Sequence, residues 1–360
     1  MPLKKISINK DISIAQTMPS NYYLCDDYFN LTLENVFSRS WQLLIDKKSL
    51  LFKINPITFL KDTYNEPLLI IKNSDKITSI SNACTHRGNL LCSIGSNNNN
   101  IQCKYHGRTF NLDGKIKKYP GFSGVKNFPA KTDNLTKIEP LIWKNFIFLS
   151  LTTPQYNFKD IFNDIESRLG WYPFDELEYS KDSSDSWIIN ANWALYCENY
   201  LEGFHVPFIH KGLNSDIELG TYQTVLLENG VLQYTHSKKI KDRLKIPEEY
   251  KNYKSDIYAY YYWLFPNIML NFYSWGLSIN IIEPIDKERT RIKFLSYPIK
   301  DNKQPSNSAS SVAKVECEDQ EIVLNVQKGL KSKFYNRGRY SVEHEKGVHH
   351  FHQLLCKFIN

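Results

Sequence analysis

Short runs of alternating apolar and polar residues characterise the first half of the chain. The segments 67–72 and 77–81 predict strands of a small antiparallel sheet. Residues 112–114, with the sequence Leu-Asp-Gly, predict a tight hairpin turn. The apolar stretch 141–149, interrupted by one polar pair, predicts a further hairpin. The pattern therefore predicts a small all-β domain over residues 41–153.

The pattern of the remaining chain combines helices with longer strands. Helical spacing of apolar residues predicts helices at 26–40, 158–169, 193–211 (interrupted near Pro207), 312–330 and 349–359. Period-two or continuous apolar runs predict strands at 186–190, 221–234, 258–265, 268–273, 277–283 and 290–298, and the polar segment 301–310 predicts a loop. Together they predict an α+β domain over residues 154–360, against which residues 1–40 pack.

The composition indicates a folded protein and excludes several classes. Hydrophobic residues make up 42% of the 360 residues and aromatic residues 14%, enough for sizeable cores. No apolar run approaches the roughly 20 residues of a membrane span, and the N-terminus lacks the apolar segment of a secretory signal. The net charge of +7 comes without a nucleic-acid-binding pattern. Seven widely spaced cysteines favour reduced thiols, so we expect a cytoplasmic protein.

Two short pairs of metal-ligating residues stand out in the predicted β domain. Cys84-Thr85-His86 and Cys103-Lys104-Tyr105-His106 each combine one soft sulfur with one imidazole nitrogen. Zinc fingers tend to pair Cys with Cys and His with His. The mixed pairs suit a two-iron, two-sulfide cluster in which one iron takes both cysteines and the other both histidines. The alternatives are a structural zinc site, or buried cysteines near unrelated histidines.

A second candidate metal site lies in the predicted α+β domain. His205 and His210 are five residues apart, and Pro207 between them loosens the helical turn so that both can converge. Two imidazoles and one carboxylate leave positions open around Fe(II) for dioxygen and a substrate. The third ligand comes from the acidic segment 316–321, where Asp319 competes with Glu316, Glu318 and Glu321. Zinc hydrolases use a similar ligand set, but hydrolysis would not need the upstream electron source.

Both sites lie in segments that resemble the Rieske non-haem iron oxygenase α subunits. The resemblance rests on the two cysteine–histidine pairs with the following segment 105–111, and on the segments 192–193, 198–210, 318–319 and 326–330. It implies a Rieske domain followed by a helix-grip (START-like) domain with an antiparallel sheet. It also implies the [2Fe-2S] ligands Cys84, His86, Cys103 and His106, and the iron ligands His205, His210 and Asp319.

The same resemblance implies further parts of an oxygenase system. Glu202 would carry electrons from a Rieske histidine of one subunit to an iron-ligating histidine of its neighbour, within a homotrimer, and Asn199 belongs to the same catalytic motif. Electrons from NAD(P)H would arrive through a separate flavin or iron–sulfur reductase, with or without a ferredoxin, and O₂ would be the cosubstrate. The chain contains no Gly-x-Gly-x-x-Gly motif of its own for a dinucleotide.

Within the family, the segments 193–207 and 265–277 resemble choline monooxygenases and their carnitine and betaine relatives. A glutamate at position 202 is typical of the subgroup that acts on quaternary amines. An aromatic cage for a quaternary ammonium group would come from four candidates, Tyr260, Tyr262, Tyr273 and Trp275. The alternative is ordinary aromatic packing on strands.

The sequence therefore predicts an oxygenase that hydroxylates or N-dealkylates a small organic molecule, with a quaternary ammonium compound as the candidate substrate. One alternative is an aromatic-ring-hydroxylating dioxygenase with the same metal centres. Another, from a different class, is a Rieske electron-transfer protein whose second half only binds a ligand.

Overall fold

The computed structural model describes residues 3–74, 76–300 and 306–360, and for residues 306–314 only the backbone is considered. The chain divides into two compact units, one formed by residues 41–153 and the other by residues 1–40 together with 154–360. Each unit has its own core and is described by itself. We call them the β unit and the α+β unit.

The β unit consists of three small antiparallel sheets with the strand orders β1-β10-β9, β2-β3-β4-β8 and β5-β6-β7. Its strands are β1 (Gln42–Asp46), β2 (Ile54–Phe59), β3 (Glu66–Asn73), β4 (Lys76–Ser81), β5 (Asn100–Gln102), β6 (Thr109–Asn111), β7 (Ile116–Lys118), β8 (Lys137–Ile138), β9 (Leu141–Trp143) and β10 (Phe146–Leu149). Buried apolar residues such as Leu69, Ile80 and Phe110 pack between the second and third sheets. The thiols of Cys84 and Cys103 lie at the edge of this core.

The α+β unit is built on one antiparallel sheet with the order β11-β17-β16-β15-β14-β13-β12. Its strands are β11 (Ser180–Ile189), β12 (Ile217–Leu227), β13 (Gly230–Ser237), β14 (Ile257–Leu264), β15 (Ile268–Tyr273), β16 (Gly276–Asp286) and β17 (Arg289–Pro298). The central strands β14, β15 and β16 are buried along most of their length. Strands buried in this way are covered on both faces, which explains their nearly continuous apolar sequences.

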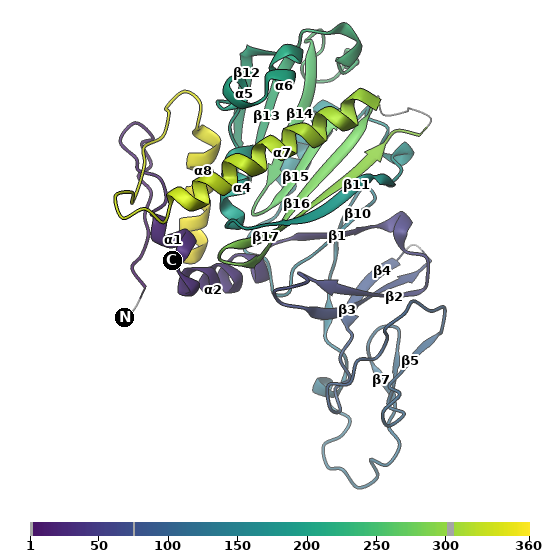
Figure 1. Ribbon diagram of the computed structural model, residues 1–360. Helices are drawn as coiled ribbons and strands as arrows, with labels where there is room; N and C mark the ends of the chain where they lie inside the picture. Colours follow the sequence, from purple (N-terminus) through teal and green to yellow (C-terminus); the bar gives the residue numbers. More distant parts are fainter. Residues whose placement is uncertain (1–2, 75, 301–305) are drawn as a thin grey trace. The chain divides into compact units, whose positions relative to one another are not determined.

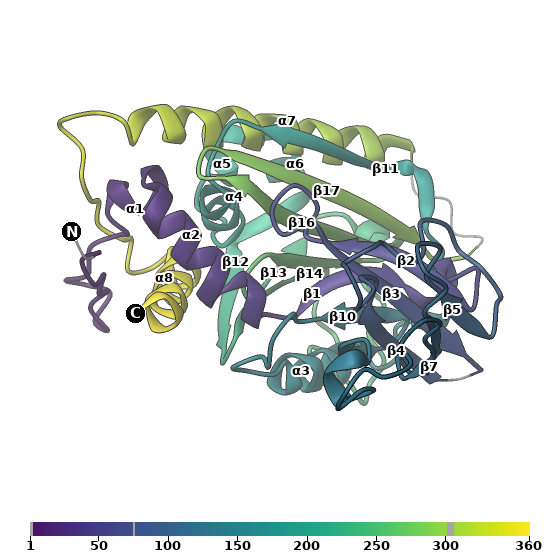
Figure 2. The same ribbon diagram turned by 90° about the horizontal axis from the view of Figure 1, so that it is seen from below.

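Helices cover the two faces of this sheet. The long helix α7 (Ser306–Gly329) crosses one face (Figure 1), where Asn280 of β16 donates a hydrogen bond to its Glu316 at 3.0 Å. The helix α3 (Lys159–Leu169) covers the other face, where the hydroxyl of Tyr262 on β14 donates to its Asp164 at 2.8 Å. Figure 2 shows α7 and α3 on opposite sides of β13 and β14. The predicted α+β class with a helix-grip arrangement is thereby confirmed.

The two ends of the chain both belong to the α+β unit. The short helices α1 (Ser20–Leu24) and α2 (Asp26–Asn35) lie near the C-terminal helix α8 (Lys346–Ile359) (Figure 1). The backbone N–H of Ile6 donates to the side chain of Asn360, whose amide donates back to Ile6. Within the described residues, no helix has the length and apolar character required to cross a membrane.

The structure departs most from the sequence prediction in three segments. The predicted strand 221–234 is a hairpin of β12 and β13, because Glu228 and Asn229 form a turn within it. The predicted helix 193–211 is three pieces, and its main break lies at residues 201–205, while Pro207 occupies the first turn of α5 (Val206–Ile209), where a missing N–H is harmless. Of the predicted loop 301–310, residues 301–305 lie outside the described residues and the rest belongs to α7.

Candidate metal centres and active-site cavity

The two cysteine–histidine pairs of the β unit occupy matching turns. In each turn the backbone N–H of a glycine donates to the cysteine carbonyl: Gly88 to Cys84 at 2.9 Å, and Gly107 to Cys103 at 3.0 Å. Both glycines have positive φ angles, 68° and 74°, which side chains with a Cβ rarely adopt. The sequence Cys-x-His needs the following Arg87 to reach its glycine, whereas Cys-x-x-His reaches it directly.

The matching turns bring the four predicted cluster ligands together. Both thiols are buried, whereas His86 is half-buried and His106 is exposed. The two imidazole rings lie 4.8 Å apart between centroids. Buried sulfurs and more exposed imidazoles would fit a cluster with its two cysteine ligands toward the core and its two histidine ligands toward the surface.

A buried arginine holds the two turns in place. Arg108 is 2% exposed, donates to the hydroxyl of Thr85 at 3.1 Å, and lies 4.6 Å from the ring centroid of Phe122. The Thr85 hydroxyl in turn donates to the carbonyl of Asp133 at 2.7 Å. The role of Arg108 could not be inferred from the residue pattern, because Arg108 follows a glycine in a segment without strand or helix periodicity.

The thiol environments suit ligands that must lose their protons. Burial disfavours the thiolate of Cys103, yet the backbone N–H groups of Tyr105 and His106 outweigh it and lower the pKa of Cys103. Asn89 adds a hydrogen bond to the same sulfur at 3.5 Å. Burial raises the pKa of Cys84, its partner across the site. These N–H donors are of the kind that stabilises sulfur ligands of iron–sulfur clusters, so the residues fit the group that they are predicted to hold.

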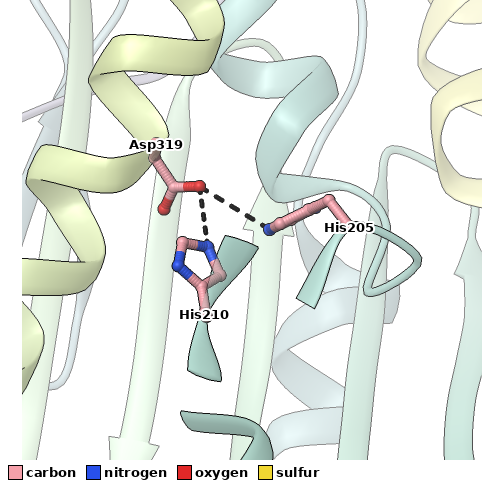
Figure 3. A group of neighbouring side chains, drawn as sticks. All are labelled: His205, His210 and Asp319. Carbon is pink, nitrogen blue, oxygen red and sulfur yellow. Dashed lines mark hydrogen bonds and ion pairs between the residues drawn. The ribbon is translucent and has the colours of Figure 1, made fainter. Parts of the chain in front are cut away.

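The second candidate site joins three residues of the α+β unit. His205 precedes α5 and His210 directly follows it, so that one short turn of helix turns both rings to the same side. Asp319 reaches them from α7 (Figure 3). Its Oδ1 atom lies 2.9 Å from Nε2 of His210 and 3.6 Å from Nε2 of His205, and the three ligand atoms lie within 4.8 Å of one another.

Two further carboxylates orient the histidines. Nδ1 of His205 lies 2.6 Å from Oε1 of Glu202, and Nδ1 of His210 lies 2.8 Å from Oε2 of Glu318. A carboxylate at Nδ1 keeps the proton there and leaves the Nε2 lone pair for a metal ion. Burial opposes the charged form of His210, but Asp319 and Glu318 outweigh it and raise its pKa.

The positions of the four acidic candidates relative to the two histidines show which of them can be the third ligand. Asp319 faces both Nε2 atoms, whereas Glu318 contacts the opposite nitrogen of His210. Glu316 contacts neither histidine, and Glu321 is exposed. Two imidazoles and one carboxylate on one side of an ion form the ligand set of ferrous oxygenases, so the residues fit a mononuclear iron.

A cavity of about 390 Å³ lies against the candidate iron ligands. Most of its polar and aromatic lining comes from α4 (Trp193–Tyr200), α7 and the sheet face below α7, and includes Asn199 and Glu202. Its aromatic side chains are Tyr196, Tyr200, Tyr222, Tyr258, Tyr261, Tyr273 and Phe294.

Of the four aromatic residues predicted for a pocket, Tyr273 lines the cavity. Tyr260 and Tyr262 lie on the opposite face of β14, where their hydroxyls donate to Asn252 at 3.1 Å and Asp164 at 2.8 Å. Trp275 stacks on Tyr273 with ring centroids 5.2 Å apart but does not line the cavity. These three residues do not line the cavity: residue composition does not show which face of β14 Tyr260 and Tyr262 occupy, and Trp275 lies in the turn between β15 and β16.

A β-bulge determines which tyrosines of β14 reach the cavity. Thr235 pairs with Ala259 and His236 pairs with Ile257, so Tyr258 is an extra residue on β14. An extra residue shifts the alternation of side chains between the two faces. Tyr258 and Tyr261, three positions apart, therefore both line the cavity.

Glu316 is a cavity residue that the sequence suggested only as a rival metal ligand. It lies one helical turn before Asp319, and the Tyr196 hydroxyl and the Asn280 amide donate to its two oxygens. Burial raises the pKa of Glu316 to about 7 in spite of these donors. The spacing of three residues on a helix was the available signal, because it places both carboxyls on one face.

Comparisons with known proteins agree with these observations. Residues 172–360 match the catalytic domain of the ring hydroxylating alpha subunit, and residues 40–129 match the Rieske [2Fe-2S] domain. Chloroplastic choline monooxygenase of Arabidopsis thaliana is 28% identical over 357 residues, which cover 95% of this chain and 82% of that protein. The carnitine monooxygenase oxygenase subunit of Escherichia coli strain K12 is 27% identical over 366 residues, covering 95% of this chain and 94% of that subunit.

A solved structure shares the fold over nearly the whole chain. It is that of a quaternary ammonium Rieske monooxygenase, with a TM-score of 0.76, 21% sequence identity, and coverage of 98% of this chain and 100% of the other. The work on that protein concerns carnitine oxidation by gut microbiota and inter-subunit electron transfer.

A Rieske domain joined to a catalytic domain of this kind defines the class of Rieske oxygenases. The chain belongs to the ring hydroxylating alpha subunit family, whose catalytic domain matches more than half of its length. It is the oxygenase component of such a system, and its two domains imply a Rieske cluster and a non-haem iron. The family and the enzyme class predicted from the sequence are confirmed.

The raised pKa of Glu316 predicts a pH-dependent effect of Glu316→Gln on the stability of iron-free protein. An unfolded glutamate ionises near its ordinary value of 4.5, and the folded one near 7, so rising pH destabilises the folded wild type across this window. A neutral glutamine escapes this loss. Denaturant unfolding should show the variant gaining about 2–3 kcal/mol relative to wild type between pH 5 and pH 8. An equal difference at both pH values would contradict the raised pKa.

Proposed function

We propose that this oxygenase component hydroxylates or N-dealkylates a small quaternary ammonium compound. The observation that carries the proposal is the cavity beside the candidate iron ligands, whose walls combine tyrosine rings with the half-buried carboxyl of Glu316. Aromatic faces attract a quaternary ammonium group through the ring quadrupole, and such a group has no N–H to donate. The similarity of the chain to choline and carnitine monooxygenases supports the same substrate class.

We propose two sets of metal ligands. The cluster ligands are Cys84, His86, Cys103 and His106, and the iron ligands are His205, His210 and Asp319. When bound, the cluster supplies electrons and the iron activates O₂ as cosubstrate. Glu202 and Glu318 retain the Nδ1 protons of the two histidines, so that their Nε2 atoms face Asp319. Asn199 lines the same cavity from α4 and is proposed to contact the substrate.

We further propose that electrons reach the iron of one subunit from the cluster of its neighbour in a homotrimer, through Glu202. The carboxylate of Glu202 already accepts from His205 and remains 13% exposed. Exposed Phe204 and Phe208 flank His205, and exposed Tyr105 lies beside His106, as expected of surfaces that another subunit covers. The inter-subunit electron transfer studied in the structural relative supports this arrangement.

The electron donor is proposed to be a separate flavin or iron–sulfur reductase that oxidises NAD(P)H, with or without a ferredoxin. The chain has no Gly-x-Gly-x-x-Gly motif for a dinucleotide of its own. A cytoplasmic location is proposed because none of the seven cysteines is paired in a disulfide.

The substrate class is tested by oxygen uptake of chemically reduced protein with a panel of compounds. Quaternary amines such as choline, carnitine and glycine betaine should stimulate uptake at least about tenfold over aromatic acids, because the cavity carries negative charge. Mass spectrometry of the products identifies the oxidised compound. Uptake with aromatic acids alone would establish ring hydroxylation instead. A chain with about two irons and no uptake with any compound would be an electron carrier.

The iron ligands are tested by Asp319→Ala. This variant should bind about two irons per chain instead of about three, lose oxygen uptake, and keep the visible absorption of the cluster, because only the mononuclear site loses a ligand. Iron analysis and absorption spectra measure the two effects separately. Glu321→Gln, an exposed residue of the same helix, is the matched control and should match wild type. A third iron retained by Asp319→Ala would reject Asp319 as a ligand.

The role of Glu202 is tested by Glu202→Gln. The amide loses the charge that attracts two imidazole N–H groups, so reoxidation of the reduced cluster by O₂ and substrate should slow at least about tenfold. Stopped-flow absorption follows this step, and iron content should stay unchanged. Glu343→Gln, an exposed glutamate on the segment before α8, serves as the control. Reoxidation at the wild-type rate would remove Glu202 from the electron path.

A further inference from the structure

The acidic side chains of the cavity differ in whether a basic residue contacts them. Five acidic side chains line it, and four of them contact a basic group: Glu202 contacts His205, Glu318 contacts His210, Asp319 contacts both histidines, and Asp216 pairs with Lys239. The fifth is Glu316, whose two hydrogen-bond partners among the described residues are the neutral Tyr196 and Asn280.

One neutral partner of Glu316, Asn280, is itself held by a chain of hydrogen bonds. The Tyr200 hydroxyl donates to the Asn271 side chain at 2.6 Å, and Asn271 donates to Oδ1 of Asn280 at 3.3 Å. This bond leaves the Asn280 amide N–H₂ free to donate to Glu316 at 3.0 Å. The chain of bonds therefore orients one carboxyl group on the cavity wall without neutralising it.

We propose that Glu316 is the specificity-determining residue of the cavity, the one that supplies the negative charge opposite the ammonium group of the substrate. The inference rests on the proposed function and adds to it a single residue that distinguishes a cation from a neutral molecule of the same shape. The tyrosine rings attract the cation, but they also pack against the three methyl groups that a neutral molecule of the same shape presents, so a full charge beside the ammonium strengthens the distinction.

The physical reason is the cost of a buried charge. A carboxylate removed from water and given only neutral donors gains strongly from a cation that enters beside it, because the surroundings screen their attraction weakly. The raised pKa of Glu316 agrees with this description of its surroundings. The other four carboxylates gain less, because Asp216 pairs with Lys239, while Glu202, Glu318 and Asp319 contact the histidines that would hold the iron cation.

Glu316 is also separate from the candidate iron ligands. It shares a helix face with Asp319, one turn away, and lines the same cavity. An ammonium group held beside Glu316 would therefore lie on the side of the cavity that α7 shares with the metal site. One helix would then position both the metal ligand and the substrate charge.

The test compares two probes of equal shape, choline and 3,3-dimethylbutan-1-ol, in which a carbon replaces the charged nitrogen. Calorimetric titration of the iron-loaded enzyme without O₂ gives both Kd values in the absence of turnover. Wild type should bind choline at least about tenfold more tightly than the alcohol. Glu316→Gln should reduce this ratio at least about tenfold while the Kd of the alcohol changes less than about threefold.

Two further variants separate charge from packing. Tyr196→Phe removes one donor but keeps the carboxyl group, and should keep a preference for choline of at least about tenfold. Glu321→Gln, on the exposed side of α7, should leave both Kd values unchanged. A loss of preference in Tyr196→Phe equal to that in Glu316→Gln would overturn the inference, because altered packing would then explain both.

The outcomes for the two proposals differ. If wild type prefers choline and Glu316→Gln keeps that preference, the tyrosine rings alone select the cation, and the inference about Glu316 is wrong while the substrate class stands. If wild type binds both probes equally, or only the alcohol, the proposed substrate class fails, and the role of Glu316 fails with it.

Discussion

The hydrogen bond between a carboxylate and the Nδ1 atom of a histidine is the interaction on which the catalytic unit depends. It occurs twice, at Glu202 with His205 and at Glu318 with His210. Each bond fixes a ring and its tautomer, so that both Nε2 atoms face Asp319. The two carboxylates come from different elements, one from the turn before α5 and one from α7, so the site forms only when helix and turn are correctly packed.

The two metal centres are built by different means. In the β unit, two backbone turns closed by Gly88 and Gly107 place the ligands, and the buried Arg108 after the second turn donates to Thr85 of the first. In the α+β unit, side chains on α7 and beside α5 place them, and the sheet provides the wall of the cavity. A cluster with fixed ligands suits rigid turns, whereas a site that admits a substrate needs a cavity beside it.

Much of this arrangement could be predicted from the sequence because its signals are local. The spacing of Cys84, His86, Cys103 and His106 lies within two turns, and the central strands β14, β15 and β16 are nearly continuous apolar runs. The lining of the cavity could not be predicted, because it depends on which face of each strand turns inward. One extra residue, Tyr258, changes that face along β14. The choice of Asp319 over its acidic neighbours came from the family resemblance, because the residue pattern alone does not show which carboxylate reaches two histidines of a distant segment.

The placement of residues 41–153 within the sequence of the α+β unit has a consequence for biosynthesis. A ribosome releases the first 40 residues of that unit, then the whole β unit, and only afterwards the strands and helices that complete the first. The β unit has all of its residues early and can acquire its fold while translation continues. The α+β unit cannot be completed before α8 and the following Asn360, which bonds with Ile6, have been synthesised. Nascent chains therefore pass through a stage in which the β unit has all of its residues and the α+β unit does not.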